Sequence, residues 1–87
     1  MLRYTVLVFR EPDGRYSVEV PTLDGCVTQG DSLEEAIAMA REAIAGYLES
    51  LAAHGEPIPR EHEPPHVLTL ELGEPTPPLK ASTPSTR

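Results

Sequence analysis

Hydrophobic and polar residues alternate along the first thirty positions in a way that predicts three short strands. Residues 2–10 are rich in Tyr, Thr, Val and Phe and are apolar on both alternate faces, which is typical of a central strand. Residues 15–20 alternate cleanly, and the turn sequence EPDG between the two runs predicts a hairpin. A Pro- and Gly-containing break at residues 21–25 then separates a third short strand at residues 26–29.

The spacing of apolar residues changes after Gly30, where a helix is predicted. Apolar side chains recur every three to four positions, as on one face of a helix: Leu33, Ile37, Ala40, Ile44, Tyr47, Leu48 and Leu51. We expect a capping box at its start, with the Ser32 hydroxyl accepting from the Glu35 amide while the Glu35 side chain reaches back. We expect the helix to end at His54-Gly55, because glycine tolerates the left-handed conformation at a helix end.

Residues beyond the helix predict one more strand and a tail. Residues 56–65 hold four prolines and should form an extended loop, and residues 66–72 alternate Leu with other residues as a strand does. The expected fold is α+β, in the order β-β-β-α-β. A right-handed crossover placing the last strand parallel to the first gives a mixed four-stranded sheet of order 3-2-1-4, with the helix on one face. We expect residues 1–72 to form one domain and the Pro/Ser/Thr-rich residues 73–87 to form a flexible tail.

This arrangement leaves one face of the sheet without a cover of its own. Leu7 and Phe9 alternate with the side chains that would meet the helix, so they should point away from it. A chain of 87 residues also buries only about 60% of the surface that it exposes when unfolded. The sequence therefore predicts self-association through Leu7 and Phe9 as a homo-oligomer.

The charge balance bears on the kind of partner. Seven Lys and Arg residues against fourteen Asp and Glu residues give a formal net charge of -7. Such a surface repels phosphate backbones and suits a basic protein partner. The single cysteine, Cys26, excludes an intramolecular disulfide and favours a reducing compartment. Since no segment resembles a signal peptide or reaches transmembrane length, we expect a cytoplasmic protein without membrane contact.

Carboxylates near the junction of sheet and helix are the first candidates for chemistry: Asp24, Asp31, Glu34 and Glu35. One interpretation is a paired-carboxylate metal site. The other is structural, because each residue already has a local role in a turn, at a helix start or in a cap. We favour the structural interpretation.

The histidines and the cysteine offer little more. His62 and His66 are four residues apart, but Pro64 and Pro65 exclude the helix on which such a pair shares a metal. His54 is separate from them, and no third strong ligand is evident. Cys26 lies in an acidic stretch and is interpreted as a buried strand cysteine. The sequence therefore predicts no catalytic residues, no metal and no cofactor.

The segment YSVEVPTLDGCVTQGDSLEEAIAMAREAIAGYLE, residues 16–49, resembles the HicB-like antitoxin pattern. It has a strand ending in Val-Pro, a Leu-x-Gly-Cys loop, Thr-x-Gly-Asp, a Glu-Glu-Ala helix start and a Tyr-Leu-Glu helix end. The correspondence covers residues 1–72. Each piece is weak by itself, whereas the combined string is specific.

The resemblance implies a truncated ribonuclease H-like fold and a toxin partner. That partner is a small basic HicA-like toxin with a double-stranded-RNA-binding-like fold, which cleaves mRNA and is neutralised when the antitoxin covers it. Many relatives add a C-terminal DNA-binding domain. Only a Pro/Ser/Thr-rich segment follows Leu72 here, so direct DNA binding is not expected.

Two alternatives stay open. The first is a stand-alone oligomeric regulatory or structural module with no toxin partner. The second is a metal-dependent nuclease, whose chemistry uses several carboxylates around two metal ions, including one on the first strand. Residues 3–10 contain no acidic residue, which disfavours the nuclease. We therefore expect a protein that is not an enzyme.

Overall fold

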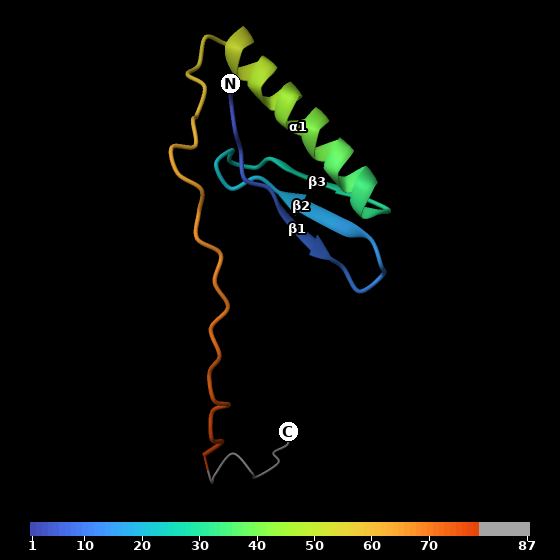
Figure 1. Cartoon of the computed structure of the whole chain (residues 1–87), viewed down its shortest axis with the longest axis vertical. Coiled ribbons are helices and arrows are strands. Elements are labelled where there is room, and N and C mark those ends of the chain that lie inside the picture. The colour runs from blue at the N-terminus through green and yellow to red at the C-terminus, as the bar shows by residue number, and fades with distance from the viewer. Residues whose placement is uncertain (79–87) are drawn as a thin grey trace.

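A computed structural model describes residues 1–78 and contains one sheet and one long helix. Strands β1 (Leu7–Arg10), β2 (Tyr16–Glu19) and β3 (Val27–Gly30) precede helix α1 (Leu33–Ala53). The sheet is antiparallel in the order β1-β2-β3. Figure 1 shows α1 lying along one face of this sheet, with the N-terminus near the end of the helix.

The β1–β2 hairpin confirms the predicted turn, although β1 is shorter than expected. Val8 lies opposite Val18, and the turn is closed by a hydrogen bond from the Gly14 amide to the Glu11 carbonyl at 2.9 Å. Gly14 has a φ of +90°, a conformation that glycine adopts readily. The predicted first strand began at residue 2. The β2 ladder ends at Glu19, however, so the residues before β1 have no strand opposite them.

Both ends of α1 carry caps. Ser32 is the N-cap and its hydroxyl accepts from the Glu35 amide at 3.1 Å. The Glu35 carboxylate accepts from the Asp31 amide, which is one residue before the cap. At the other end, Gly55 has a φ of +69° and its amide donates to the Ala52 carbonyl at 3.1 Å.

The core lies between the sheet and α1 in two adjoining clusters. Val18 of β2 packs on Ala36 and Ala40, the two fully buried residues of the helix. The second cluster is formed by three residues from the end of β2 and the following loop, packed against the later turns of the helix: Val20, Leu23, Cys26, Ile44, Tyr47 and Leu48. The small alanines allow α1 to approach the sheet closely, and the larger side chains fill the wider end.

The predicted fourth strand and the four-stranded sheet of order 3-2-1-4 are wrong. Within residues 1–78 the structure has three strands, and residues 66–72 run as an extended arm away from the domain (Figure 1). Leu68, Leu70 and Leu72 are 76%, 78% and 88% exposed. Alternation specifies an extended backbone with one apolar side, but it does not specify which edge the segment pairs with. The extended backbone of residues 66–72 was therefore predicted, whereas their pairing with the first strand was not found.

Two further expectations concern the flexible tail and contact with a membrane. Residues 73–78 are exposed and have no regular structure, whereas residues 79–87 of the predicted tail lie outside the described residues. Across residues 1–78, α1 is neither apolar enough nor sufficiently free of charge to cross a membrane.

Candidate interaction surfaces

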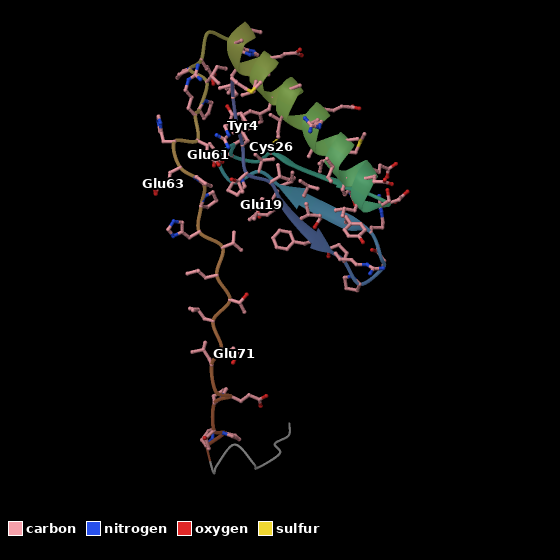
Figure 2. The ribbon with its side chains drawn as sticks, viewed as in Figure 1. Tyr4, Glu19, Cys26, Glu61, Glu63 and Glu71 are labelled. Atoms are coloured by element: carbon pink, nitrogen blue, oxygen red, sulfur yellow. The ribbon has the colours of Figure 1, made fainter. Side chains whose placement is uncertain are left out.

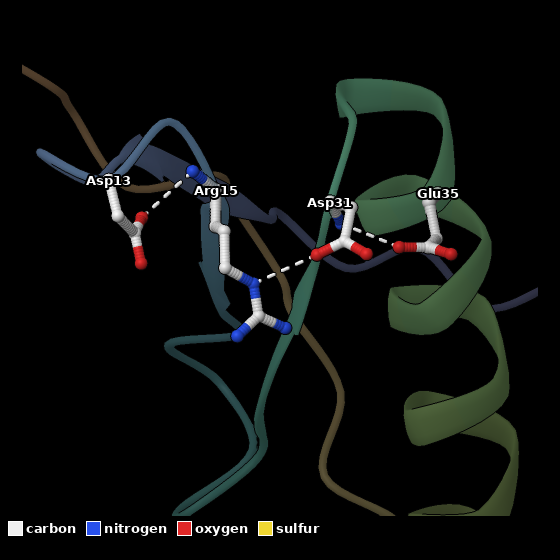
Figure 3. Close-up of polar contacts among 4 residues, drawn as sticks. All are labelled: Asp13, Arg15, Asp31 and Glu35. Atoms are coloured by element: carbon white, nitrogen blue, oxygen red, sulfur yellow. Dashed lines mark hydrogen bonds and ion pairs between the residues drawn. The ribbon is translucent and has the colours of Figure 1, made fainter.

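The four candidate carboxylates lie on the surface, and two of them, Asp31 and Glu35, make hydrogen bonds with neighbouring elements. Arg15 donates from Nε to Asp31 Oδ1 at 2.9 Å, and its amide donates to Asp13 Oδ1 at 2.9 Å (Figure 3). Glu35 accepts from the Asp31 amide, so the same chain of contacts links the hairpin turn to the start of α1. Asp24 is exposed on its loop. Among residues 1–78, no three His, Cys, Asp or Glu residues come together as a metal site would require.

The histidines and Cys26 are not brought together either. His62 and His66 are exposed on the segment after α1, and His54 lies with Nδ1 2.7 Å from the Ser50 carbonyl at the helix end. Cys26 is buried in the core, and burial raises the pKa of its thiol. A thiol that keeps its proton is a poor nucleophile, so this cysteine acts as a small core residue.

Sequence reasoning missed a tertiary anchor at Glu61. One Glu61 oxygen accepts from the Thr5 amide at 2.8 Å and the other accepts from the Thr5 hydroxyl at 2.6 Å. The Thr22 hydroxyl adds a third contact at 3.1 Å, and the nearby Tyr4 hydroxyl donates to the Pro59 carbonyl at 2.5 Å. Figure 2 shows Tyr4 and Glu61 where the loop after α1 meets the start of the sheet. No local pattern signals this anchor, because Thr5 and Glu61 are 56 residues apart.

The anchor predicts a pH-dependent attachment of the loop. Hydrogen bonds from the Thr5 side chain and amide hold the pKa of Glu61 below its usual value, so folding favours the carboxylate. A group with a lowered pKa stabilises the fold above its unfolded-state pKa, about 4.3, and that stabilisation is lost as the pH falls through the folded-state pKa. We therefore expect Glu61→Ala to lower the melting temperature and the hydrogen-exchange protection of the Thr5 amide at pH 7. Both differences should shrink toward pH 3.

The matched control is Glu63→Ala, which removes the same charge two residues away. Glu63 is exposed and makes no side-chain hydrogen bond within the described residues. Its substitution should leave the protection of the Thr5 amide unchanged at every pH. Equal effects of the two substitutions would contradict the anchor.

An apolar groove runs between α1 and the chain that leads into β1. It has a volume of about 610 Å³. Its lining includes three side chains from the N-terminal segment and three from the helix: Tyr4, Val6, Val8, Ile37, Ile44 and Leu48. The groove exists because α1 packs mainly over β3 and β2, which leaves the β1 side of the helix uncovered.

The face of the sheet opposite α1 is a second exposed surface. Phe9 and Val27 are 49% and 66% exposed there, and Leu7 is half-buried. A shallow depression passes between Phe9 and Val27 and is bordered by Glu19. Exposed apolar side chains therefore lie beside the acidic side chains of Glu11 and Glu19 on this surface.

The arrangement of elements and the motif spacing agree with one known family. Residues 4–70 match the model of the HicB-like antitoxin of bacterial toxin-antitoxin systems. The chain belongs to this family. The match takes in all three strands, α1, the Glu61 anchor and most of the arm.

Relatives of this HicB-like chain are similar over most of its length. The UPF0150 protein Ta0767 of Thermoplasma acidophilum is 48% identical over 61 residues, covering 70% of this chain and 88% of that protein. The UPF0150 protein ssr1765 of Synechocystis is 52% identical over 58 residues, covering 67% of this chain and 73% of that protein. The crystal structure of the N-terminal domain of Burkholderia pseudomallei antitoxin HicB aligns with a TM-score of 0.60 at 33% identity. That alignment covers 63% of this chain and 65% of the crystallised chain.

The motif pieces of the HicB-like pattern have structural roles in this member. Leu23 fills the core from the loop after β2, and Gly25 has a φ of +73° in the turn that brings Cys26 back beneath the helix. The Val20 amide donates to the Cys26 carbonyl at 3.0 Å, and the Cys26 amide donates to the Leu23 carbonyl at 3.0 Å. The Leu-x-Gly-Cys segment is therefore a folded plug between β2 and β3.

Proposed function

We propose that this chain is an antitoxin that binds a small basic HicA-like toxin directly and thereby blocks its cleavage of mRNA. Membership of the HicB-like family is the observation that carries the proposal. The formal net charge of -7 supports it, because opposite charge steers two proteins together and favours a basic partner over a phosphate backbone. Under this proposal the chain is not an enzyme, takes no cofactor and does not bind DNA directly.

The outer side of α1 is the part of the acidic surface best suited to a basic toxin. Glu42 and Glu49 are seven residues apart, so they lie on one side of the helix two turns from each other, and both are exposed. No ion pair within the described residues uses either carboxylate. They can therefore meet cationic side chains of a partner without first losing a contact inside this chain.

The sheet face opposite α1 serves self-association in the same proposal. Phe9 and the half-buried Leu7 lie on that face, and Val27 extends its apolar area onto β3. A second copy covering this face would remove apolar surface from water that the isolated chain leaves exposed. The helix side and the sheet side would then serve different partners.

Co-expression with the small basic protein encoded by an adjacent gene tests the proposal. We expect a complex in a pull-down and rescue of growth that the toxin alone arrests. The pair of substitutions Glu42→Lys and Glu49→Lys should slow association by roughly tenfold at low salt, since charge at an interface acts mainly on the association rate. Stopped-flow binding at several salt concentrations measures this effect.

The control carries Glu42→Lys together with Glu56→Lys in place of Glu49→Lys. It makes the same total charge change, but Glu56 lies beyond the end of α1. The control should bind faster than the helix pair. Absence of both complex and rescue would contradict the toxin claim and leave a stand-alone regulatory oligomer as the better description.

A further inference from the structure

Residues 66–72, the arm, have the alternating sequence of a strand but pair with no strand within residues 1–78. The backbone of the arm is extended (Figure 1), and alternation along an extended backbone places Leu68, Leu70 and Leu72 on one side of it. Every residue from 66 to 72 is exposed. An extended segment with one apolar side is the form in which peptides add to the open edge of a sheet.

The matching open edge is on β1. Strand β1 lies at the border of the sheet, and within residues 1–78 it pairs with β2 alone, so its outward amides and carbonyls have no strand opposite them there. The apolar groove lies below α1, along the segment that leads into this edge and as far as Val8 of β1. Its walls carry Tyr4, Val6 and Val8 on one side and helix residues on the other. A strand placed there would pair with the edge and be covered by the helix.

The dimensions agree as well. The arm has seven residues, as does the segment 2–8 that borders the groove. Seven extended residues span about 23 Å. Three leucines at alternate positions would face the groove along that length, while Thr69 and Glu71 would face solvent.

The path of the chain favours the edge of a second copy. Glu61 is tied to Thr5, which leaves only residues 62–65 between this anchor and the arm. Pro64 and Pro65 occupy half of that connector, fix their own φ near −65° and hold the residue before them extended. The arm consequently runs straight away from its own domain (Figure 1). A short stiff connector with a displaced strand is the arrangement in which copies exchange elements.

We infer that residues 66–72 of one chain pair with the free edge of β1 in a second copy, with Leu68, Leu70 and Leu72 in the groove beneath α1. The two-fold exchange places the arm of each chain on the other, so both grooves are filled. The inference does not depend on a toxin. It also uses a different surface from the sheet face that carries Leu7 and Phe9.

Light scattering of the full-length protein at micromolar concentration tests the exchange. The measurements are made with Phe9→Asp present throughout, so that association through the sheet face does not contribute to the mass. We expect a dimer. Adding Leu70→Asp should convert it to a monomer, while adding Thr69→Asp on the other side of the arm should leave the dimer intact.

The groove side offers a second matched pair on α1. Ile37 is 45% exposed in the groove, and the neighbouring Ala38 is exposed outside it. Ile37→Glu should give a monomer and Ala38→Glu a dimer, with the same helical circular dichroism in both. Two results would overturn the inference. One is a monomer for the protein that carries Phe9→Asp alone, and the other is a dimer that neither Leu70→Asp nor Ile37→Glu dissociates.

Disulfide trapping decides between exchange and folding back. A chain carrying Val8→Cys is mixed with chains carrying Leu68→Cys, Leu70→Cys or Leu72→Cys and is then oxidised. The native Cys26 stays in place, because its side chain is buried in the core and is not accessible to a second chain. We expect a covalent dimer for at least one arm position. No covalent dimer at any of the three, or an intramolecular disulfide when both changes are on one chain, would refute exchange.

Discussion

Leu23→Ala should lower the free energy of unfolding by about 2–5 kcal/mol, a large fraction of the stability of so small a domain. Leu23 is 1% exposed and is the largest of the fully buried side chains. It reaches from the loop after β2 into the cluster formed with Ile44, Tyr47 and Leu48. Truncation leaves a cavity that the loop cannot close easily, because its backbone is tied to Val20 and Cys26. Urea unfolding followed by circular dichroism measures the change.

The neighbouring residue provides the control. Asp24 is exposed on the same loop, so Asp24→Ala should change the free energy of unfolding by no more than about 0.5 kcal/mol. A small effect at Leu23 would mean that the loop moves to fill the space. In that case the Leu-x-Gly-Cys segment could not be described as a fixed plug.

The hairpin and the helix could be predicted because their causes are local. A turn sequence with Gly14 and a period-3.6 stripe starting near Leu33 act over a few residues each, and both elements formed where they were expected. The start of the first strand was predicted five residues too early. β1 starts at Leu7 because the length of a strand depends on its neighbour, and β2 offers no ladder beyond Glu19.

The contacts of residues 59–72 could not be predicted because their causes are distant. Glu61 meets Thr5 and Thr22 across 56 and 39 positions. Nothing near Glu61 in the sequence marks it among the other acidic residues. The leucines of the arm gave a correct indication of extended backbone and a wrong one of pairing within the chain. The pattern of apolar residues indicates which side chains a segment can bury. The connector at residues 62–65 and its two prolines affect where the segment can bury them.

The Glu61 anchor and the position of the arm are connected. The Glu61 anchor holds the end of the loop at the start of β1, beside the open edge and the groove. The anchor thereby sets where the arm leaves the domain, and so how far the arm can extend toward a second copy of the chain. Loss of the anchor at acid pH should free the connector, so strand exchange and loop attachment are expected to weaken in the same pH range.

Gly30→Ala should lower the free energy of unfolding by about 1–3 kcal/mol, since overfilling a packed site forces the backbone to shift. Gly30 is buried at the end of β3, where the chain passes under the first turn of α1. A Cβ at this position would lie 2.5 Å from the Ala36 amide nitrogen and 2.8 Å from the Ala36 Cα. These are backbone atoms, so no side chain can rotate away. The helix start itself would have to move, together with the Ser32 cap.

Gly46 shows what the same methyl group does where there is room. It lies within α1, and a Cβ there meets nothing within 4 Å. Gly46→Ala should therefore raise the free energy of unfolding by roughly 0.5–1 kcal/mol through helix propensity alone. Opposite signs for the two substitutions, measured by urea unfolding under one set of conditions, would show that Gly30 is required for close approach of strand and helix. A stabilising Gly30→Ala would instead place the start of α1 farther from β3 than the structure has it.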